Sequence, residues 1–259
     1  MGSGSIRRSG APALAFLALA ACKSMPRDLA VTATGSYWMP EPDGHVTIGA
    51  GSQPGSATHA DLEHDLGIDD DAQWTGRVDA SFGKHRFGVE YLPFDLGGSG
   101  VTGGFTFQGA AYPAGDAISS DLELTTWVAR WDYQLESRKR TEDSLRIGLD
   151  AWWWGFDSRV RGIVSGNDEA RSFTRLYPGA HVDLRFDLNR GLLLDVAAAV
   201  AGTGYHRHLL DLSGALGWRF SDSGHLAAGY RWIEWDFDHG NDHGNFGLLG
   251  PFAALTFRF

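Results

Sequence analysis

The chain has 259 residues, a formal net charge of −10 and 21% charged side chains. This negative charge argues against nucleic acid as a partner, because phosphate binding requires clustered lysine and arginine. Beyond the N-terminal segment, no apolar run reaches the roughly 18 residues of a membrane-spanning helix, which argues against a helical membrane protein. The 35 glycines and 10 tryptophans suit a transmembrane β-barrel, whose strands carry a weak alternating signal.

The N-terminus has the features of an export signal. Arg7 and Arg8 form a basic segment, and residues 11–21 form a short apolar segment that ends in small residues. The only cysteine, Cys22, completes a Leu-Ala-Ala-Cys run that resembles a bacterial lipobox, which implies lipidation of this residue. Ordinary signal cleavage at the nearby Ala-Leu-Ala run is the alternative. We therefore predict a signal peptide over residues 1–22.

The mature segment, residues 23–259, is predicted to be one domain of strands whose side chains alternate between apolar and polar. Residues 40–71 are rich in glycine, serine and acids and are predicted to form a loop. The alternation slips near residues 233–235, which indicates either a bulge or the end of the bilayer band. The predicted strands cover residues 29–37, 74–82, 87–91, 127–135, 145–151, 182–188, 192–200, 210–220, 226–232 and 253–259.

The connections alternate between short turns and longer segments, as the periplasmic turns and extracellular loops of bacterial barrels do. We therefore predict an all-β fold, a transmembrane antiparallel up-and-down β-barrel of about ten strands with both termini in the periplasm. If residues 104–118 insert into the barrel rather than project above the membrane, the count becomes twelve. The short turns lie at Gly83, Glu136, Asn189 and Ser221, and the longer segments are 40–71, 97–119, 156–173 and 238–244.

The last strand places Leu255, Phe257 and Phe259 on one face, and the chain stops on this aromatic. This ending resembles the C-terminal signature of bacterial outer-membrane β-barrels, in which the final strand closes the barrel and carries the assembly signal. The resemblance implies an outer-membrane location, the barrel-assembly machinery as a partner, and contact with membrane lipid and lipopolysaccharide. Residues 61–71, 105–124 and 250–259 together resemble a family of uncharacterised proteobacterial outer-membrane barrels, which implies no particular activity.

The predicted inner face carries charges of both signs in near balance. A charge facing lipid near the bilayer midplane costs a few kcal/mol, so these side chains must point into the lumen. Barrels of about eight strands are just filled by side chains, and ten strands are only a little wider. We expect arginine–carboxylate bridges that fill the lumen, with a narrow conduit or ligand slot as the alternative. The residues are Arg77, Asp79, Glu90, Arg130, Asp132, Arg146, Asp150, His181, Asp183, Arg185, Asp195, Asp211, Arg219, Arg231 and Arg258.

Two polar segments contain side chains that could ligate a metal ion. Residues 61–71 are densely acidic, but the spacing Asp-x-Asp-x-Asp-Gly of a calcium loop is absent. His206 and His208 share one face, yet two imidazoles need a third ligand. We therefore predict no metal site and no cofactor.

The last predicted loop contains Asp236, Asp238 and His239 at the barrel rim. An Asp–His pair at a rim resembles the omptin proteases, which are also ten-stranded and activate water with an Asp pair and an Asp–His pair. The second pair would have to come from residues 69–71, and no other omptin motif matches. A hydrolase at the rim, omptin-like or lipid A-modifying, is the alternative function; we predict no catalytic residues and no enzyme.

The run Trp152-Trp153-Trp154 suits an aromatic girdle at the membrane interface. Strict alternation would instead turn Trp152 and Trp154 inward, where they would stack on a sugar or lipid. The whole sequence predicts a small monomeric outer-membrane barrel with a structural or interaction role at the cell surface, or one that binds or slowly passes a small solute.

Overall fold

The computed structural model describes residues 29–50, 57–69, 71–137, 143–189, 191–204 and 207–259. The predicted signal peptide and Cys22 lie outside these residues. Within the described part of the chain, no helix is long and apolar enough to cross a membrane.

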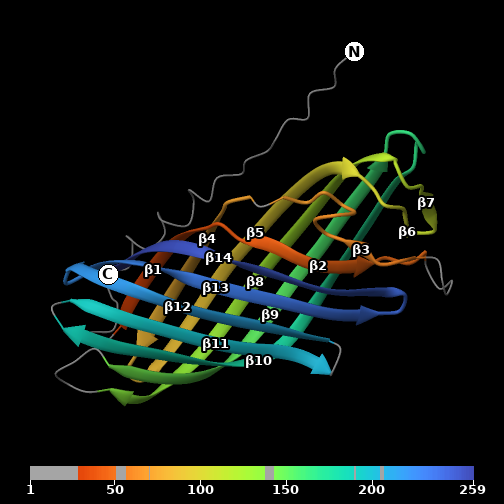
Figure 1. The fold of residues 1–259 in the computed structure, drawn as a ribbon. Coiled ribbons are helices and arrows are strands. Elements are labelled where there is room, and N and C mark those ends of the chain that lie inside the picture. Colours follow the sequence, from red (N-terminus) through yellow and green to blue (C-terminus); the bar gives the residue numbers. More distant parts are fainter. Residues whose placement is uncertain (1–28, 51–56, 70, 138–142, 190, 205–206) are drawn as a thin grey trace.

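The structure is a closed antiparallel barrel of ten strands (Figure 1). Each barrel strand pairs with the next in chain order, and β14 pairs back onto β1. The ten are β1 (Leu29–Trp38), β4 (Gln73–Phe82), β5 (His85–Val101), β8 (Ala117–Ser137), β9 (Ser144–Gly162), β10 (Asp168–Asn189), β11 (Leu192–Gly204), β12 (Arg207–Ser221), β13 (Gly224–His239) and β14 (Asp242–Arg258). The prediction of a ten-stranded up-and-down barrel is confirmed.

The barrel closes at the last residue of the chain. The backbone N–H of Phe259 donates to the carbonyl of Val31 at 2.8 Å, and the N–H of Val31 donates to the carbonyl of Phe259 at 3.3 Å. The first described residue, Leu29, and the C-terminus therefore lie at the same end of the barrel, which we call the terminal end (Figure 1).

Side chains alternate along each strand, but the polarity of the two faces reverses part of the way up the barrel. On β8, Trp131 points outward and Asp132 is buried inside, whereas eight residues earlier in the same strand Glu123 is exposed and Leu124 is buried. The half of the lumen near the terminal end is thus polar inside, and the other half is packed with apolar side chains. The buried residues of this second half include Leu92, Phe94, Leu96, Leu122, Leu124, Trp154, Phe156, Ile233, Trp235, Phe237, Phe246 and Leu248.

Two short segments cover this apolar core at the end opposite the termini, which we call the roofed end. The first contains β2 (Glu41–Thr47), which pairs with β14, and β3 (Ala60–Asp61), which pairs with β2. The second is a separate hairpin of β6 (Phe105–Phe107) and β7 (Ala110–Tyr112). The backbone N–H of Gln108 donates to the carbonyl of Ile48 at 2.8 Å and joins the two segments. Their buried side chains are Val46, Ile48, Ala60, Leu62, Leu66, Ile68, Phe105, Phe107 and Tyr112.

Several predicted loops are wrong in the same way, because strands continue through them. Residues 40–71 contain β2 and β3, and residues 97–119, 156–173 and 238–244 include strand ends that reach Val101, Gly162 and His239. The slip of alternation near residues 233–235 is not a bulge, because β13 pairs with β14 there without a shift of register, and it coincides with the reversal of polarity. The hairpin of β6 and β7 stands apart from the barrel, so the twelve-stranded alternative is wrong.

Candidate functional site

The polar half of the lumen contains one connected network of ion pairs. It joins six carboxylates to five guanidinium groups and one imidazole, contributed by β4, β5, β8, β9, β10, β12 and β13. The members are Arg77, Asp79, Arg86, Glu90, Arg130, Asp132, Arg146, Asp150, His181, Asp183, Asp211 and Arg231.

Arg130 lies at the centre of the network. Its Nη2 is 3.1 Å from Glu90 and 3.5 Å from Asp211, and its Nε is 3.7 Å from Asp150. Arg231 reaches across the lumen to two of the same acids, with Nη1 2.7 Å from Glu90 and Nη2 2.9 Å from Asp211. Strands β5, β8, β9, β12 and β13 are therefore tied together through the lumen rather than only around the wall.

The network ends where the apolar core begins. The guanidinium of Arg130 lies 5.6 Å from the ring centroid of Trp152, and that of Arg231 lies 5.6 Å from the ring centroid of Trp38. These contacts are cation–π interactions at the boundary between the two halves. A cavity of about 70 Å³ beside Arg231 is lined by Ser36, Trp38, Thr75, Ser213 and Phe252.

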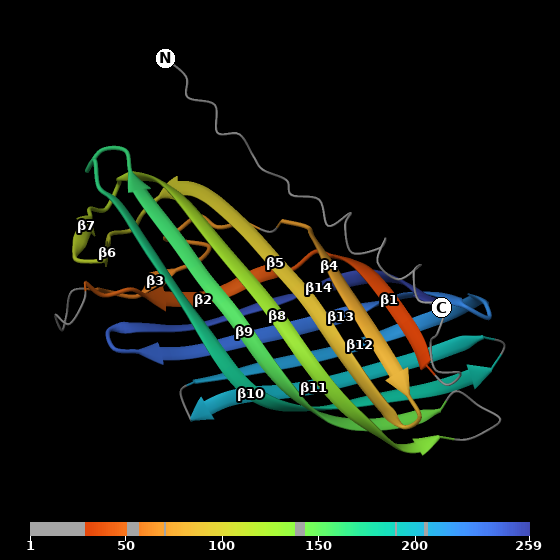
Figure 2. The same cartoon turned by 180° about the vertical axis from the view of Figure 1, so that it is seen from behind.

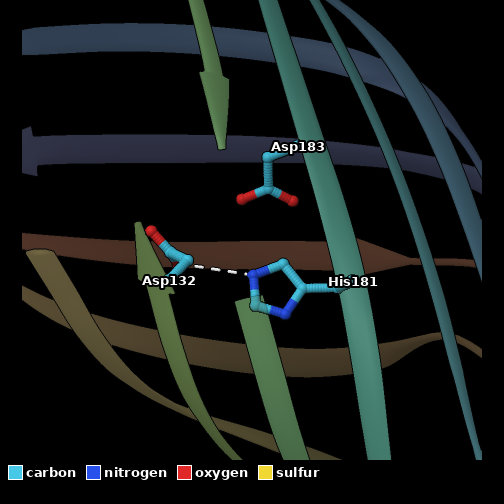
Figure 3. Close-up of side chains that lie close together, drawn as sticks. All are labelled: Asp132, His181 and Asp183. Carbon is cyan, nitrogen blue, oxygen red and sulfur yellow. Dashed lines mark ion pairs between the residues drawn. The ribbon is translucent and has the colours of Figure 1, made fainter. Parts of the chain in front are cut away.

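A second part of the network surrounds His181 (Figure 3). Its Nδ1 is 2.7 Å from Asp150 and its Nε2 is 3.4 Å from Asp132, and the side chain is 1% exposed. Arg86 bonds to Asp132 at 2.8 Å and also to Asp183. Both ring nitrogens lie within ion-pair distance of a carboxylate, an arrangement that favours the doubly protonated imidazolium.

Charge balance decides what this cluster can hold. Asp132, His181 and Asp183 offer ligand atoms within 4.8 Å of one another. With His181 as an imidazolium, however, the network has six positive and six negative groups, and its carboxylates are already engaged by arginine. A divalent cation would add two uncompensated charges to a buried site, so the arrangement favours internal neutralisation over metal binding.

Glycine makes room for these buried groups. A Cβ atom on Gly148 would lie 2.4 Å from the His181 ring, and one on Gly88 would lie 2.4 Å from the Asp79 carboxylate. Both glycines occupy inward-facing positions of β9 and β5, and a residue with a side chain would displace the neighbouring group at either position.

The remaining predicted lumen residues lie nearer the terminal end. Arg185 pairs with Asp195 at 2.6 Å between β10 and β11, with both side chains partly exposed. Arg219 also faces inward, whereas Arg258 is exposed beside the C-terminus.

The predicted rim residues do not point into the barrel. Asp236 and Asp238 alternate on β13 with the buried Trp235 and Phe237, so both carboxylates lie on the outer face. Asp238 lies 3.2 Å from His243, and Asp236 lies 3.7 Å from His208. The side chain of His239 and all of His206 lie outside the described residues.

The first part of the acidic segment 61–71, residues 61–66, forms a turn with internal hydrogen bonds. The Asp61 carboxylate accepts the backbone N–H groups of Glu63 at 3.0 Å and His64 at 2.8 Å. Partial burial opposes ionisation, but the hydrogen bonds from His64 outweigh it and hold the pKa of Asp61 below its ordinary value. Glu63 and Asp69 also line a pocket of about 570 Å³ against β2 and β14.

The tryptophan run divides between the two faces of β9. Trp153 is 56% exposed on the outer wall, as expected of a girdle. Trp152 and Trp154 are fully buried instead, so the girdle interpretation is wrong for them, and alternation through the strand explains why. Trp154 packs on Phe173 and Phe237, with ring centroids 5.7 and 5.8 Å away.

Two polar contacts at the roofed end are not predicted by the sequence pattern. Arg171 on β10 bonds to the buried Asp242 with Nε 2.9 Å from Oδ2. Asp116 accepts the backbone N–H groups of Val164 at 2.8 Å and Ser165 at 3.2 Å. Both contacts lie in segments predicted as loops, and a predicted loop gives no expectation of which side chains point inward.

No protein-family model matches the chain, and no curated protein matches its sequence. Among solved structures, the outer-membrane protease OmpT from Escherichia coli is similar with a TM-score of 0.55 at 9% identity, over 92% of this chain and 99% of that one. The transport unit of the autotransporter AIDA-I from Escherichia coli gives 0.46 at 9% identity, over 92% of each chain. Ail from Yersinia pestis gives 0.43 at 10% identity, over 90% of this chain and 99% of that one. The similarity to OmpT shows that the chain has the fold of an outer-membrane β-barrel.

Proposed function

We propose that the protein is a non-conducting barrel of the outer membrane that holds a rigid extracellular platform with a structural or interaction role at the cell surface. The observation that carries this proposal is that the lumen is filled at two levels by different means. Ion pairs fill the terminal half, and a roofed apolar core fills the other.

The outer wall supports the membrane assignment. Exposed apolar side chains cover the terminal half of the barrel on every side, whereas the roofed half exposes acids such as Asp121, Glu123 and Asp157. A bilayer around the first half leaves the second half in water. The roofed end is then extracellular, and both ends of the described chain are periplasmic. The apolar belt includes Trp74, Val78, Phe87, Val89, Trp127, Trp131, Ile147, Leu149, Trp153, Phe186, Leu212, Leu216, Trp218, Tyr230, Leu255 and Phe257.

The platform ends in an exposed apolar tip. Ile163 is 73% exposed and Val164 is 75% exposed in the turn between β9 and β10, and Val101 at the end of β5 is 65% exposed. Asp116 holds this turn through the backbone N–H groups of Val164 and Ser165. Exposed aliphatic side chains on a fixed turn suit contact with another surface.

Conductance tests the closed lumen. In a planar bilayer the purified protein is expected to give no steady conductance of porin size. A steady, large single-channel conductance would contradict the proposal, because neither half of the lumen contains a wide passage between the described residues.

Adhesion tests the tip. Cells expressing the protein are expected to bind an apolar-coated surface more strongly than cells expressing Ile163→Asp with Val164→Asp. Ser172→Asp, on the exposed wall of β10, is the control for added charge. Equal adhesion of cells that express the unmodified protein, the double variant and the control would remove the tip from the proposal.

Expression is also expected to leave lipid A mass and peptide processing unchanged, and a change in either would support the hydrolase instead.

A further inference from the structure

The barrel wall has a notch beside β10. This strand pairs with β9 from Asp168 to Arg185 but with β11 only from Gly179 to Asn189. The edge of β10 over residues 168–178 therefore has no strand partner on the β11 side within the described chain. Figure 2 shows the first half of β10 rising away from the end of β11. The start of β12 and the end of β13 lie on the other side of this opening.

Arg175 lies on this unpaired edge and has no carboxylate partner among the described residues. Its guanidinium lies 5.1 Å from the ring centroid of Phe173, and Nη1 donates to the carbonyl of Thr174 at 2.8 Å. Its Nη2 atom is buried without a hydrogen-bond partner. An unsatisfied buried donor on a cation is costly unless something else accepts from it.

A second arginine, which forms no ion pair with any described residue, lies across the notch. Arg207 begins β12 and is exposed. Arg207 pairs with Gly204 at the end of β11, and the neighbouring His208 pairs with Asp236 of β13, so Arg207 lies on the side of the opening across from the unpaired residues 168–178, which include the buried Tyr177. The carboxylate of Asp236 is opposed by His208, 3.7 Å away. The notch thus presents two guanidinium groups and a phenol.

This arrangement is unusual within the molecule. The chain carries a net charge of −10, and most other inward-facing arginines contact carboxylates: Arg77, Arg86, Arg130, Arg146, Arg171, Arg185 and Arg231. Two unpaired guanidinium groups on one opening therefore indicate an anion that lies outside the chain. Arginine pairs bind phosphate oxygens well, because the planar guanidinium donates two parallel hydrogen bonds.

The level of the notch points to the source of the anion. Leu176, the neighbour of both Arg175 and Tyr177, points outward with 63% exposure, and it pairs with the girdle residue Trp153. Val200 on β11 is 55% exposed on the same wall. We propose that the notch binds the phosphate monoester of an outer-leaflet lipid, with Arg175, Arg207 and Tyr177 on the phosphate and Leu176 and Val200 beside the acyl chains.

Calorimetric titration in a neutral detergent tests this site with three probes: dihexanoyl phosphatidic acid, dihexanoyl phosphatidylcholine and inorganic phosphate. We expect phosphatidic acid to bind the unmodified protein, and Arg175→Met with Arg207→Met to weaken binding at least about tenfold, because each lost charge-assisted hydrogen bond is worth roughly that factor. The control is Arg159→Met with Arg161→Met, which removes two exposed arginines of β9 that pair with Asp168.

The outcomes separate clearly. Phosphatidic acid binding that survives in the control and falls in the Arg175/Arg207 variant supports the lipid site. Binding of inorganic phosphate as tight as that of phosphatidic acid, with the same dependence on the two arginines, assigns the site to free phosphate. Equal binding by the Arg175/Arg207 variant and the unmodified protein, or no binding of either phosphate probe, overturns the proposal. A heat-dependent gel shift equal to that of the unmodified protein shows that the variants are folded.

Discussion

Arg171 on β10 and Asp242 at the β13–β14 turn form a bond across the roofed end, with Nε 2.9 Å from Oδ2. The other oxygen of the same carboxylate accepts the backbone N–H of Gly49 at 3.1 Å. The Asp242 side chain is 1% exposed. One carboxylate therefore joins a barrel strand, a barrel turn and the segment that covers the apolar core.

Replacing Arg171 should loosen the roof. Arg171→Met leaves a buried carboxylate with one remaining donor, and we expect a loss of about 1–3 kcal/mol in the free energy of unfolding of this end. Limited proteolysis in detergent measures this loss of stability as faster cleavage within residues 41–68. Arg159→Met removes an arginine whose pair with Asp168 is largely exposed, and it should have little effect. Equal protease sensitivity in the two variants would contradict the bridging role.

Arg130 should be the most costly arginine to lose from the polar lumen. Arg130→Met leaves Glu90, Asp150 and Asp211 short of one shared positive charge, and breaking a buried pair on one side costs about 3–5 kcal/mol. Urea unfolding followed by gel mobility measures this loss. The matched control is Arg185→Met, whose pair with Asp195 is about one-third exposed, and it should lose under about 1 kcal/mol. A smaller loss for Arg130 than for Arg185 would contradict a network centred on Arg130.

The sequence predicts the half of the barrel near the terminal end well, because a strand in the proposed bilayer has only one favourable arrangement. Trp131 faces outward and Asp132 inward there, since the opposite would place a charge in hydrocarbon. The same reasoning fails for the half near the roofed end. There Glu123 faces water and Leu124 faces the core, so strands that continue through the predicted loops carry the pattern of a soluble barrel.

The sequence also does not predict which acid each arginine pairs with. Arg231 bonds to Glu90, which lies 141 residues earlier in the sequence, and the bond crosses the lumen rather than following the wall. Which arginine meets which acid depends on the tilt and stagger of the strands, which alternation alone does not determine. The bond between Arg171 and Asp242 depends in addition on how β10 leans over the β13–β14 turn.

Gly148 should be intolerant of even one added carbon. A Cβ atom there would lie 2.3 Å from the carbonyl oxygen of Trp131 and 2.4 Å from the His181 ring. We expect Gly148→Ala to displace His181 from its carboxylates and to lower the free energy of unfolding by about 1–3 kcal/mol, a typical cost of overpacking. Gly76→Ala is the matched control, because no atom lies within 4 Å of its added Cβ. Similar gel-shift temperatures for the two variants would show that the ring has room to move.

The turn that carries the apolar tip should depend on the ionisation of Asp116. The hydrogen bond from the Ser165 side chain, followed by those from the backbone N–H groups of Val164 and Ser165, holds the pKa of Asp116 below its ordinary value of 3.8. Because the folded pKa is the lower one, this stabilisation is complete above about pH 3.8 and is lost as the pH falls through the folded value. Hydrogen exchange, corrected for its intrinsic pH dependence, should therefore show constant protection of Val164 and Ser165 from pH 7 to about pH 4, and less protection in more acidic solution.

Asp116→Asn should reduce that protection already at pH 7, whereas Asp168→Asn, in an exposed pair with Arg159, should not. Protection that declines between pH 7 and pH 5, or that survives unchanged in Asp116→Asn, would mean that the carboxylate does not hold the tip.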